Sequence, residues 1–361
     1  MKNKLKIHFI YGESKSSAFG INNLSDYLIK SLSRVVTYNI ISYKKKFNLP
    51  FSGKFYRYLY YPIKSFLKVF NKDGVVHISS QLYGHICYLF LILRRKIIIT
   101  CCDIIPLIYP GGYSSFDLFF YRISLSGLKK ATKIIAISKS TKNDLIKYLK
   151  IPKQKIIVIY PGIDKQNSIL KEKRKKELKK RLFSDKKVIL YVGSYLKNKN
   201  INGLIKVFYE IHKEIKSAIL VIVNEKEKMP NEYIDLMYNL GVQKMVRFTN
   251  HVTDQELVNI YNCSDILIYP SFYEGFGLPP LEAMACGCPV ITSNTSSLPE
   301  VVGDAGIMVD HNDYNEIAKN AIMLLKNPEI RNKMIMKGLK QTEKFRNSLS
   351  EKVLDIYKEL I

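Results

Sequence analysis

The stretch DILIYPSFYEGFGLPPLEAMACGCPVITSNTSSLPEVVGDAGIMVD, residues 265–310, carries the pattern that decides the fold of this chain. Its first apolar run, Ile266–Tyr269, stops at a proline, which is typical of a strand buried on both faces of a parallel sheet. Pro279 and Pro280 stand where a helix can begin, because the first helical turn does not need their missing N–H groups. A second apolar run follows at 289–292. The stretch therefore predicts strand, loop, helix and strand, the unit of a doubly wound α/β sheet.

The loop before this helix combines glycines with a carboxylate. Gly275 and Gly277 allow the backbone to approach a ligand closely, and the helix adds free N–H groups and the positive end of its dipole. This arrangement predicts a phosphate site. Glu274 and Glu282 flank the site and would repel a phosphate, unless they hydrogen-bond hydroxyl groups of the same ligand. A ligand with a diphosphate and many hydroxyl groups meets both demands, so these residues predict a nucleotide-sugar.

Residues 273–306 closely resemble the donor-binding signature of the family 4 retaining glycosyltransferases, including the spacing of Glu274 and Glu282. The resemblance implies a GT-B fold, in which two doubly wound, Rossmann-like α/β domains face each other across a deep cleft. It also implies that Glu274 binds the transferred sugar and that Glu282 binds the ribose. The diphosphate would meet Lys199 and backbone amides of the donor loop. The residues of this donor loop are Glu274, Gly275, Phe276, Gly277 and Leu278.

The chain length agrees with this two-domain partition, since 361 residues suffice for two ordinary α/β domains. We expect residues 1–165 to form an acceptor domain and residues 183–340 to form the donor domain. The charged segment 166–182 is expected to be a linker helix. The end of the chain, 341–361, is expected to be a helix that crosses back to the first domain, as in the resembling fold.

A second loop is expected to complete the donor site. In the family, the loop after the first strand of the donor domain often carries Arg or Lys against the diphosphate. Lys199 matches such a position, whereas Asn198 stands where many members have arginine. A single lysine, backbone amides and a helix N-terminus can still neutralise much of a diphosphate. The other expected donor-binding positions follow strands and are Gly193, Ser194, Asn250 and His251.

Candidate acceptor contacts lie at strand ends in the first domain. Gly20 and Asn22 belong to the loop after the first strand, which is either an acceptor contact or an ordinary strand-to-helix connection. His77 ends a buried strand, where a histidine is more often structural than functional. Relatives carry a histidine near the transferred sugar where this chain has Cys102, and a thiol cannot copy the protonation of imidazole. Asp103 still matches the family and is a candidate catalytic residue.

The charge of the chain is strongly positive and uneven. There are 57 Lys and Arg against 31 Asp and Glu, a net charge of +26. Residues 1–150 hold 25 basic and 6 acidic side chains, or +19, which predicts an anionic partner for this part. The segment 51–70 interleaves aromatic and basic side chains, so it is either a contact with anionic membrane lipid or a helix pair packed on the sheet. The basic run 171–182 lacks a recognised binding motif, and no nucleic-acid partner is expected.

Several classes of protein are disfavoured by the same sequence. The six cysteines have no metal-ligand spacing, no Asp-x-Asp triplet indicates a metal, and we expect neither a metal nor a cofactor. The N-terminus shows no cleavable signal, and no apolar run reaches the ~18–20 residues needed to span a bilayer. We therefore expect a cytoplasmic protein, either free or peripheral on the inner face of the cell membrane.

The leading hypothesis is a metal-independent, retaining hexosyltransferase with Glu274, Asp103 and Lys199 as candidate catalytic residues. It would move a mannose- or glucose-type sugar from a GDP- or UDP-linked donor to a glycan or lipid-linked acceptor in surface polysaccharide or glycoconjugate synthesis. Two alternatives stay open at this point. One is a non-catalytic subunit that binds a nucleotide-sugar, and the other is a GT-B enzyme of another reaction, such as an epimerase or a phosphorylase.

Overall fold

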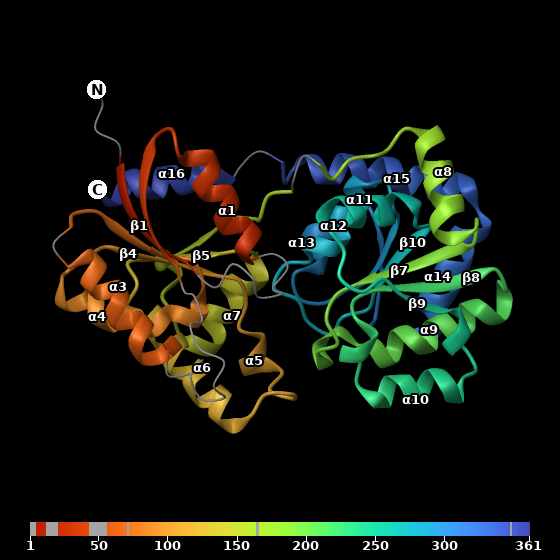
Figure 1. Cartoon of the computed structure of the whole chain (residues 1–361), viewed down its shortest axis with the longest axis horizontal. Coiled ribbons are helices and arrows are strands. Elements are labelled where there is room, and N and C mark those ends of the chain that lie inside the picture. The colour runs from red at the N-terminus through yellow and green to blue at the C-terminus, as the bar shows by residue number, and fades with distance from the viewer. Residues whose placement is uncertain (1–4, 12–20, 43–55, 71, 164–165, 347–348) are drawn as a thin grey trace. The chain divides into compact units, whose positions relative to one another are not determined.

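The structure of the chain, a computed structural model, has two compact α/β units (Figure 1). It describes residues 5–11, 21–42, 56–70, 72–163, 166–346 and 349–361. Unit 1 consists of Met1–Gly162 and Asn347–Ile361, and unit 2 consists of Ile163–Arg346.

Unit 1 is built on a parallel six-stranded sheet with the order β2-β1-β3-β4-β5-β6. Its strands are β1 (Leu5–Tyr11), β2 (Val36–Ser42), β3 (Val75–Ile78), β4 (Ile97–Cys101), β5 (Lys133–Ala136) and β6 (Ile156–Val158). Its α-helices are α1 (Ile21–Leu32), α3 (Tyr61–Val69), α4 (Cys87–Ile92), α5 (Ile105–Ile108), α6 (Ser115–Leu128), α7 (Lys139–Leu149) and α16 (Leu349–Leu360). In Figure 1, α1 and α16 cover one face of this sheet, and α3, α4 and α6 cover the other. Every side chain of β3 and β4 is buried, as expected for strands covered on both faces.

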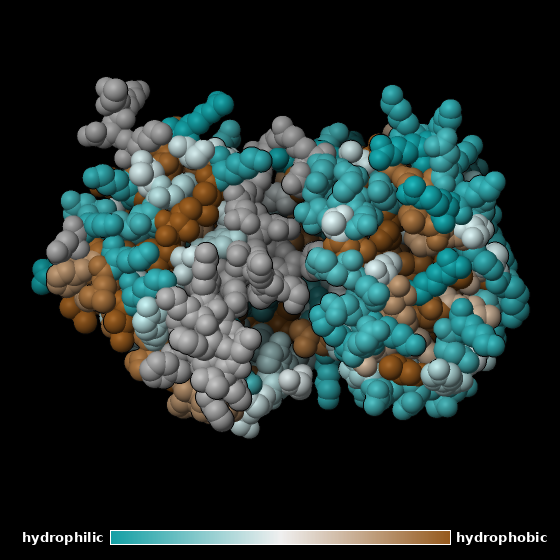
Figure 2. Space-filling model, in the orientation of Figure 1, coloured by the Kyte–Doolittle hydropathy of each residue, from teal (hydrophilic) through white to brown (hydrophobic). Residues whose placement is uncertain are grey.

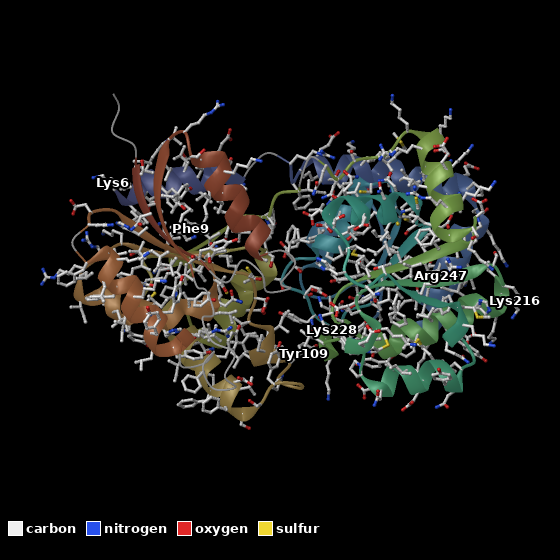
Figure 3. All side chains as sticks on the ribbon, viewed as in Figure 1. Lys6, Phe9, Tyr109, Lys216, Lys228 and Arg247 are labelled. Carbon is white, nitrogen blue, oxygen red and sulfur yellow. The ribbon has the colours of Figure 1, made fainter. Side chains whose placement is uncertain are left out.

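Helix α16 joins unit 1 although it lies at the far end of the sequence. Its Tyr357 is fully buried, and the hydroxyl lies 2.7 Å from Nδ1 of His77 on β3. The imidazole of His77 also packs edge-on against Phe9 of β1, with the ring centroids 4.8 Å apart (Phe9 is labelled in Figure 3). Buried aromatic contacts of this kind attach the C-terminal helix to the sheet.

Unit 2 repeats the architecture with a parallel sheet of order β12-β11-β10-β7-β8-β9. Its strands are β7 (Lys187–Val192), β8 (Ala218–Val223), β9 (Val246–Phe248), β10 (Ile266–Tyr269), β11 (Val290–Ser293) and β12 (Ile307–Val309). Its α-helices are α8 (Glu172–Phe183), α9 (Ile201–Glu214), α10 (Asn231–Asn239), α11 (Asp254–Cys263), α12 (Leu278–Ala285), α13 (Leu298–Val302), α14 (Tyr314–Lys326) and α15 (Pro328–Glu343). The predicted pair of doubly wound α/β domains is confirmed.

The strand order of unit 2 reverses direction between β7 and β10. These two strands are direct neighbours in the sheet, with Ile266 opposite Ile189, although 73 residues lie between the end of β7 and the start of β10. Open α/β sheets bind ligands outside the carboxyl ends of their strands, at the point where the strand order reverses. The loop after β7 and the loop after β10 meet at this point. The predicted donor-site residues Lys199 and Glu274 lie on these two loops.

The segment predicted to be a linker, 166–182, is instead part of unit 2. Leu178 of α8 is buried, and Nζ of Lys179 lies 2.6 Å from the buried carboxylate of Asp265. These contacts hold α8 on the body of unit 2, although most of its surface is charged. At the other boundary, residues 341–346 stay with unit 2, and unit 1 takes up the chain from Asn347. None of the helices in the described part of the chain has the length and apolar composition required to cross a bilayer.

Candidate active site

The loops after β7 and β10 are tied together by backbone and amide hydrogen bonds. The N–H of Phe272 donates to the carbonyl oxygen of Asn198 at 2.8 Å, and Nδ2 of Asn198 donates to the carbonyl oxygen of Tyr273 at 2.8 Å. Asn200 caps helix α9 through the N–H of Gly203 and also donates to the carbonyl oxygen of Pro270. Asn198 therefore supports the loop that carries Glu274.

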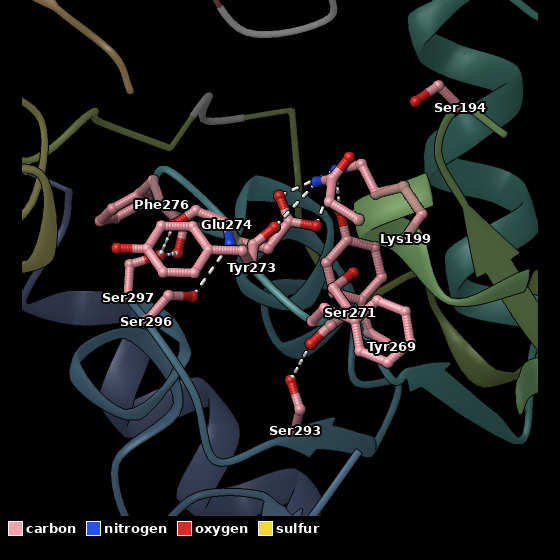
Figure 4. A network of polar contacts seen from close by, with 12 residues as sticks. Ser194, Lys199, Tyr269, Ser271, Tyr273, Glu274, Phe276, Ser293, Ser296 and Ser297 are labelled. Atoms are coloured by element: carbon pink, nitrogen blue, oxygen red, sulfur yellow. Dashed lines mark hydrogen bonds and ion pairs between the residues drawn. The ribbon is translucent and has the colours of Figure 1, made fainter. Parts of the chain in front are cut away.

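Lys199 and Glu274 form an ion pair at the centre of the site (Figure 4). Nζ of Lys199 lies 2.7 Å and 2.8 Å from the two carboxylate oxygens of Glu274, and 3.1 Å from the hydroxyl oxygen of Tyr269. The Lys199 side chain is 15% exposed and the Glu274 side chain is 7% exposed. Burial, reinforced by the charge of Glu274, raises the pKa of Tyr269 well above its usual value, so Tyr269 is a neutral phenol beside the pair.

Two serines after β11 hold the backbone around Glu274. The N–H of Glu274 donates to Oγ of Ser296 at 2.9 Å. The Ser297 hydroxyl donates to the carbonyl oxygens of Glu274 and Phe276 (Figure 4). The oxygen–oxygen distances are 3.0 Å and 2.7 Å. The Glu274 carboxylate is therefore held by Lys199, and the backbone at Glu274 is held by the loop after β11. Such support restricts the side chain to one position, which an active site requires.

Helix α12 begins at Leu278, directly after Gly277. Gly277 has φ +110°, a backbone conformation that favours glycine, and a Cβ at this position would also lie 2.8 Å from Cδ2 of Leu298. Pro279 and Pro280 follow in the first turn and carry no N–H group. This helix end consequently offers fewer amide donors than an ordinary N-terminus.

Glu282 lies in the second turn of α12 and is half-buried. One of its oxygens accepts a hydrogen bond of 2.9 Å from the hydroxyl of Tyr261 on α11. Burial and then the nearby Glu282 carboxylate raise the pKa of Tyr261 well above its usual value, so this phenol is a donor at neutral pH. Tyr261 thereby orients the carboxylate that is predicted to bind the ribose.

The remaining donor-site candidates follow strands β7 and β9. A Cβ on Gly193 would lie 2.7 Å from the hydroxyl oxygen of Tyr191, which itself donates to the carbonyl oxygen of Ser194 at 2.8 Å. The close approach explains the glycine at this position. Asn250 and His251 are exposed after β9, where Asn250 has the left-handed φ of +59°. They lie at the carboxyl edge of the same sheet, two strands away from β7.

The candidates in unit 1 are less favourable as ligand contacts. His77 is fully buried, and its ring nitrogens lie within hydrogen-bond distance of Tyr357 and Thr100, so it is not accessible to an acceptor. Cys102 is 5% exposed, and burial raises the pKa of its thiol far above the usual value. Asp103 is half-buried, and its carboxylate accepts the N–H of Ile105 at 3.0 Å.

Gly20 and Asn22 are the two other acceptor candidates of unit 1. Gly20 lies outside the described residues, and Asn22 lies in helix α1, in a part where only the backbone is described. Within the described chain, no group of three or more His, Cys, Asp or Glu side chains is arranged to hold a metal ion.

Sequence reasoning missed the residues that support Glu274, namely Ser296, Ser297 and Tyr269. The polar run 293–297 directly after an apolar strand is a signal that could have identified the serines, because such a run lies at the carboxyl edge of the sheet. For Tyr269, the sequence offers only one aromatic residue at the end of a buried strand, which does not distinguish a core ring from a site residue.

Two protein-family models match neighbouring parts of the chain. The family model "Glycosyl transferases group 1" matches residues 172–341, and the model "Glycosyltransferase Family 4" matches residues 26–167. O-antigen chain mannosyltransferase B of Escherichia coli is 36% identical over 157 residues, which cover 43% of this chain and 41% of that protein. O-antigen chain mannosyltransferase RfbU of Salmonella typhimurium is 30% identical over 223 residues, 61% of this chain and 58% of that protein. The chain thus spans 41% and 58% of the length of these two curated relatives.

Solved structures resemble the whole chain at low sequence identity. Anabaena Alr3699/HepE, solved with UDP and glucose, has a TM-score of 0.81 and 17% identity, and the match covers 99% of this chain and 100% of that one. Sucrose-phosphate synthase from Thermosynechococcus elongatus has a TM-score of 0.80 and 19% identity, with 99% of both chains covered. These similarities establish the GT-B fold. The two family models between them match most of the sequence and support a group 1 glycosyltransferase.

Proposed function

We propose that this chain is a hexosyltransferase that moves a mannose- or glucose-type sugar from a nucleotide-sugar to a glycan or lipid-linked acceptor in surface polysaccharide synthesis. The names of two relatives, O-antigen chain mannosyltransferases, support the kind of sugar and the kind of product. The observation that carries the proposal is the nearly buried Lys199–Glu274 pair at the point where the strand order of unit 2 reverses.

This ion pair suits a donor that brings both charge and hydroxyl groups. Lys199 and Glu274 neutralise each other in the structure, with the ammonium shared between both carboxylate oxygens. A diphosphate would offer Lys199 a second anionic partner, and sugar hydroxyls would offer Glu274 new donors. Neither group then becomes an unpaired buried charge when the donor enters, a condition that buried ions must meet.

The proposed chemistry is departure of the nucleoside diphosphate with arrival of the acceptor hydroxyl on the same face of the sugar, so that the anomeric configuration is retained. Negative charge grows on the leaving phosphate as the glycosidic bond breaks, and Lys199 is the cation of unit 2 that would stabilise it. The proton of the acceptor hydroxyl passes to that phosphate, so no protein base and no metal ion is assigned. Asp103 is retained as the candidate carboxylate of unit 1.

Two donors are the first to test. HepE has been solved with UDP-glucose, and the curated relatives are mannosyltransferases. We therefore propose a UDP- or GDP-linked hexose, with Glu282 at the ribose hydroxyls. Backbone groups near Asn250 and His251 would meet the base.

The decisive experiment is a thermal-shift screen of nucleotide-sugars, because stabilisation by a ligand reports affinity without an acceptor. Glu274→Gln is the site variant, and Lys213→Met is the matched control, because Lys213 pairs with Glu210 on the exposed surface of α9 at a similar distance of 2.8 Å. We expect one donor to stabilise the wild type and Lys213→Met equally and Glu274→Gln much less. Equal stabilisation of all three proteins, or none by any nucleotide-sugar, would contradict the proposal.

Transfer itself is tested with the donor that binds best and a set of lipid-linked glycans. The anomeric configuration of the product, read by nuclear magnetic resonance, decides between retention and inversion. Activity that persists in EDTA supports the metal-independent reaction, and activity that is lost in EDTA and restored by Mg²⁺ contradicts it.

A further inference from the structure

Helix α3 of unit 1 has an apolar face that the protein does not cover. Its inner face, with Tyr61 and Val69, is buried in the core of unit 1. Ile63, Leu67 and Phe70 recur at helical spacing on the outer face and are 47%, 68% and 48% exposed. A helix that is apolar on both sides is usually covered on both sides. The outer face of α3 therefore requires an explanation.

Two neighbouring helices repeat this feature. On α4, Tyr88 and Ile92 are 42% and 74% exposed. On α6, Phe116, Phe119 and Ile123 recur at intervals of three and four residues and are 50%, 58% and 36% exposed. Each helix therefore has one face in the core and a second apolar face open to solvent.

The three helices lie side by side, so their exposed faces can act together. Phe66 of α3 packs against Phe90 of α4, with the ring centroids 6.3 Å apart. The hydroxyl of Tyr88 on α4 lies 3.0 Å from Oγ of Ser126 on α6. We call the outer faces of α3, α4 and α6 the α3–α4–α6 surface. In Figure 2, hydrophobic atoms gather at the left edge of the view, where Figure 1 places α3 and α4.

Cations accompany these apolar side chains. Between residues 56 and 130 the sequence has ten Lys and Arg and three Asp and Glu, a net charge of +7. Lys68 adjoins Leu67 on α3, Arg122 adjoins Ile123 on α6, and both cations are exposed. One of the three acidic residues, Asp73, is within 3.6 Å of Arg95. The surface is therefore apolar and positive together, which matches the outer layer of an anionic bilayer.

Ordinary surface scatter does not account for this grouping. Single exposed apolar residues are normal on any protein, whereas a contiguous apolar patch indicates an interaction site. The large apolar residues exposed on unit 2, such as Tyr238 on α10 and Met336 on α15, are spread over separate elements. A protein partner could cover this surface by apolar contact alone. The excess of cations would then have no role.

We propose that the α3–α4–α6 surface binds the surface of an anionic lipid bilayer. The exposed apolar side chains enter the interface between headgroups and acyl chains, and the neighbouring Lys and Arg contact lipid phosphates. The proposal extends the expectation for the segment 51–70, because α4 and α6 also carry exposed apolar side chains. It involves no residue of the donor site, so it stands or falls independently of the proposed function.

The test is flotation of the full chain with vesicles of phosphatidylglycerol and phosphatidylethanolamine, compared with vesicles of phosphatidylcholine. The test variant is Leu67→Ser/Ile92→Ser/Phe119→Ser, which removes the most exposed apolar side chain from each helix. The matched control is Tyr238→Ser/Ile330→Ser/Met336→Ser, which removes exposed apolar side chains from unit 2. We expect the partition of the test variant into anionic vesicles to fall by at least ~10-fold, and that of the control to stay at the wild-type level.

A second variant keeps the proposal testable if the triple variant fails to fold. Lys68→Glu/Arg122→Glu changes only exposed cations, and it should reduce binding to anionic vesicles by roughly tenfold or more. Absence of wild-type binding to anionic vesicles would overturn the proposal, as would equal binding by the charge variant. A wild-type dimer in light scattering that the charge variant converts to a monomer, without vesicle binding, would assign the surface to a second copy of the chain instead.

Discussion

Replacing Lys199 with methionine should lower the free energy of unfolding of unit 2 by about 3 kcal/mol, the lower end of the range for removing one member of a buried ion pair. The structure supports this magnitude, because Glu274 is 7% exposed and both of its oxygens lie within 2.8 Å of the Lys199 ammonium. Methionine keeps the length of the side chain, so the packing beside Tyr269 is largely preserved. The loss therefore reports an unpaired carboxylate and not a cavity.

The companion variants separate charge from shape. Glu274→Gln leaves Lys199 unpaired, but this side chain is 15% exposed and can extend its ammonium to water, so we expect a loss of about 1–2 kcal/mol. In Lys199→Met/Glu274→Gln no unpaired charge remains, and the loss should be only about 1 kcal/mol. The double variant should thus be more stable than Lys199→Met alone, a non-additivity that a double-mutant cycle measures.

The assay is urea and thermal unfolding followed by far-UV circular dichroism, since the chain has no tryptophan. Because two units unfold, the affected transition is assigned to unit 2 by hydrogen exchange of the Ile266–Tyr269 strand. A loss of 3 kcal/mol corresponds to a fall in Tm of about 6–12 °C for a domain of this size. All three variants should also lose transfer activity, including the double variant that is nearly as stable as the wild type.

Two results would refute this reasoning. If Lys199→Met is as stable as the wild type, the ion pair contributes nothing to the fold of unit 2. If the double variant is stable and still transfers sugar, neither charge takes part in the reaction, and the site must lie elsewhere.

Three other changes test separate parts of the structure. Glu282→Ala should weaken donor binding by roughly 1–3 kcal/mol, measured by titration calorimetry, and unchanged affinity would exclude the ribose contact. Gly277→Ala should destabilise unit 2 by about 1–3 kcal/mol, because of the φ of +110° and the 2.8 Å approach to Leu298; an unchanged Tm would show that the loop can relax. Burial lowers the pKa of His77 to about 3, whereas the imidazole pKa in the unfolded chain is near 6.5. Between these two pH values the unfolded chain binds more protons than the folded chain. The free energy of unfolding therefore falls as the pH drops from 6.5 toward 3. His77→Gln should remove its share of this loss, about 2–3 kcal/mol at pH 4.5, and an unchanged pH profile of unfolding would assign the loss to other groups.

The sequence by itself determined the fold class. Strands buried on both faces have continuous apolar sequences, such as Ile266–Tyr269, and these runs alternate with helical segments along the chain. Local conformation could also be predicted from the sequence. The start of α12 depends only on the glycine loop before it and on the two prolines in its first turn. The two carboxylates of the site, Glu274 and Glu282, could be named for the same reason.

Only the tertiary structure decided which groups meet. Lys199 reaches Glu274 across 75 residues of sequence because β7 and β10 are neighbours in the sheet. His77 is closed off by Tyr357, 280 residues later, because α16 returns to unit 1. The charged segment 166–182 proved to be part of unit 2, although its composition resembles a solvated linker.

The same division explains the α3–α4–α6 surface. The sequence shows that these helices are rich in apolar residues on more than one side, but hydrophobic periodicity does not say which side the core will cover. That choice depends on the packing of whole elements, which is set by strand order and crossover connections over long sequence separations. Local patterns therefore specify the pieces of this protein, and long-range packing specifies its ion pair, its buried histidine and its exposed apolar face.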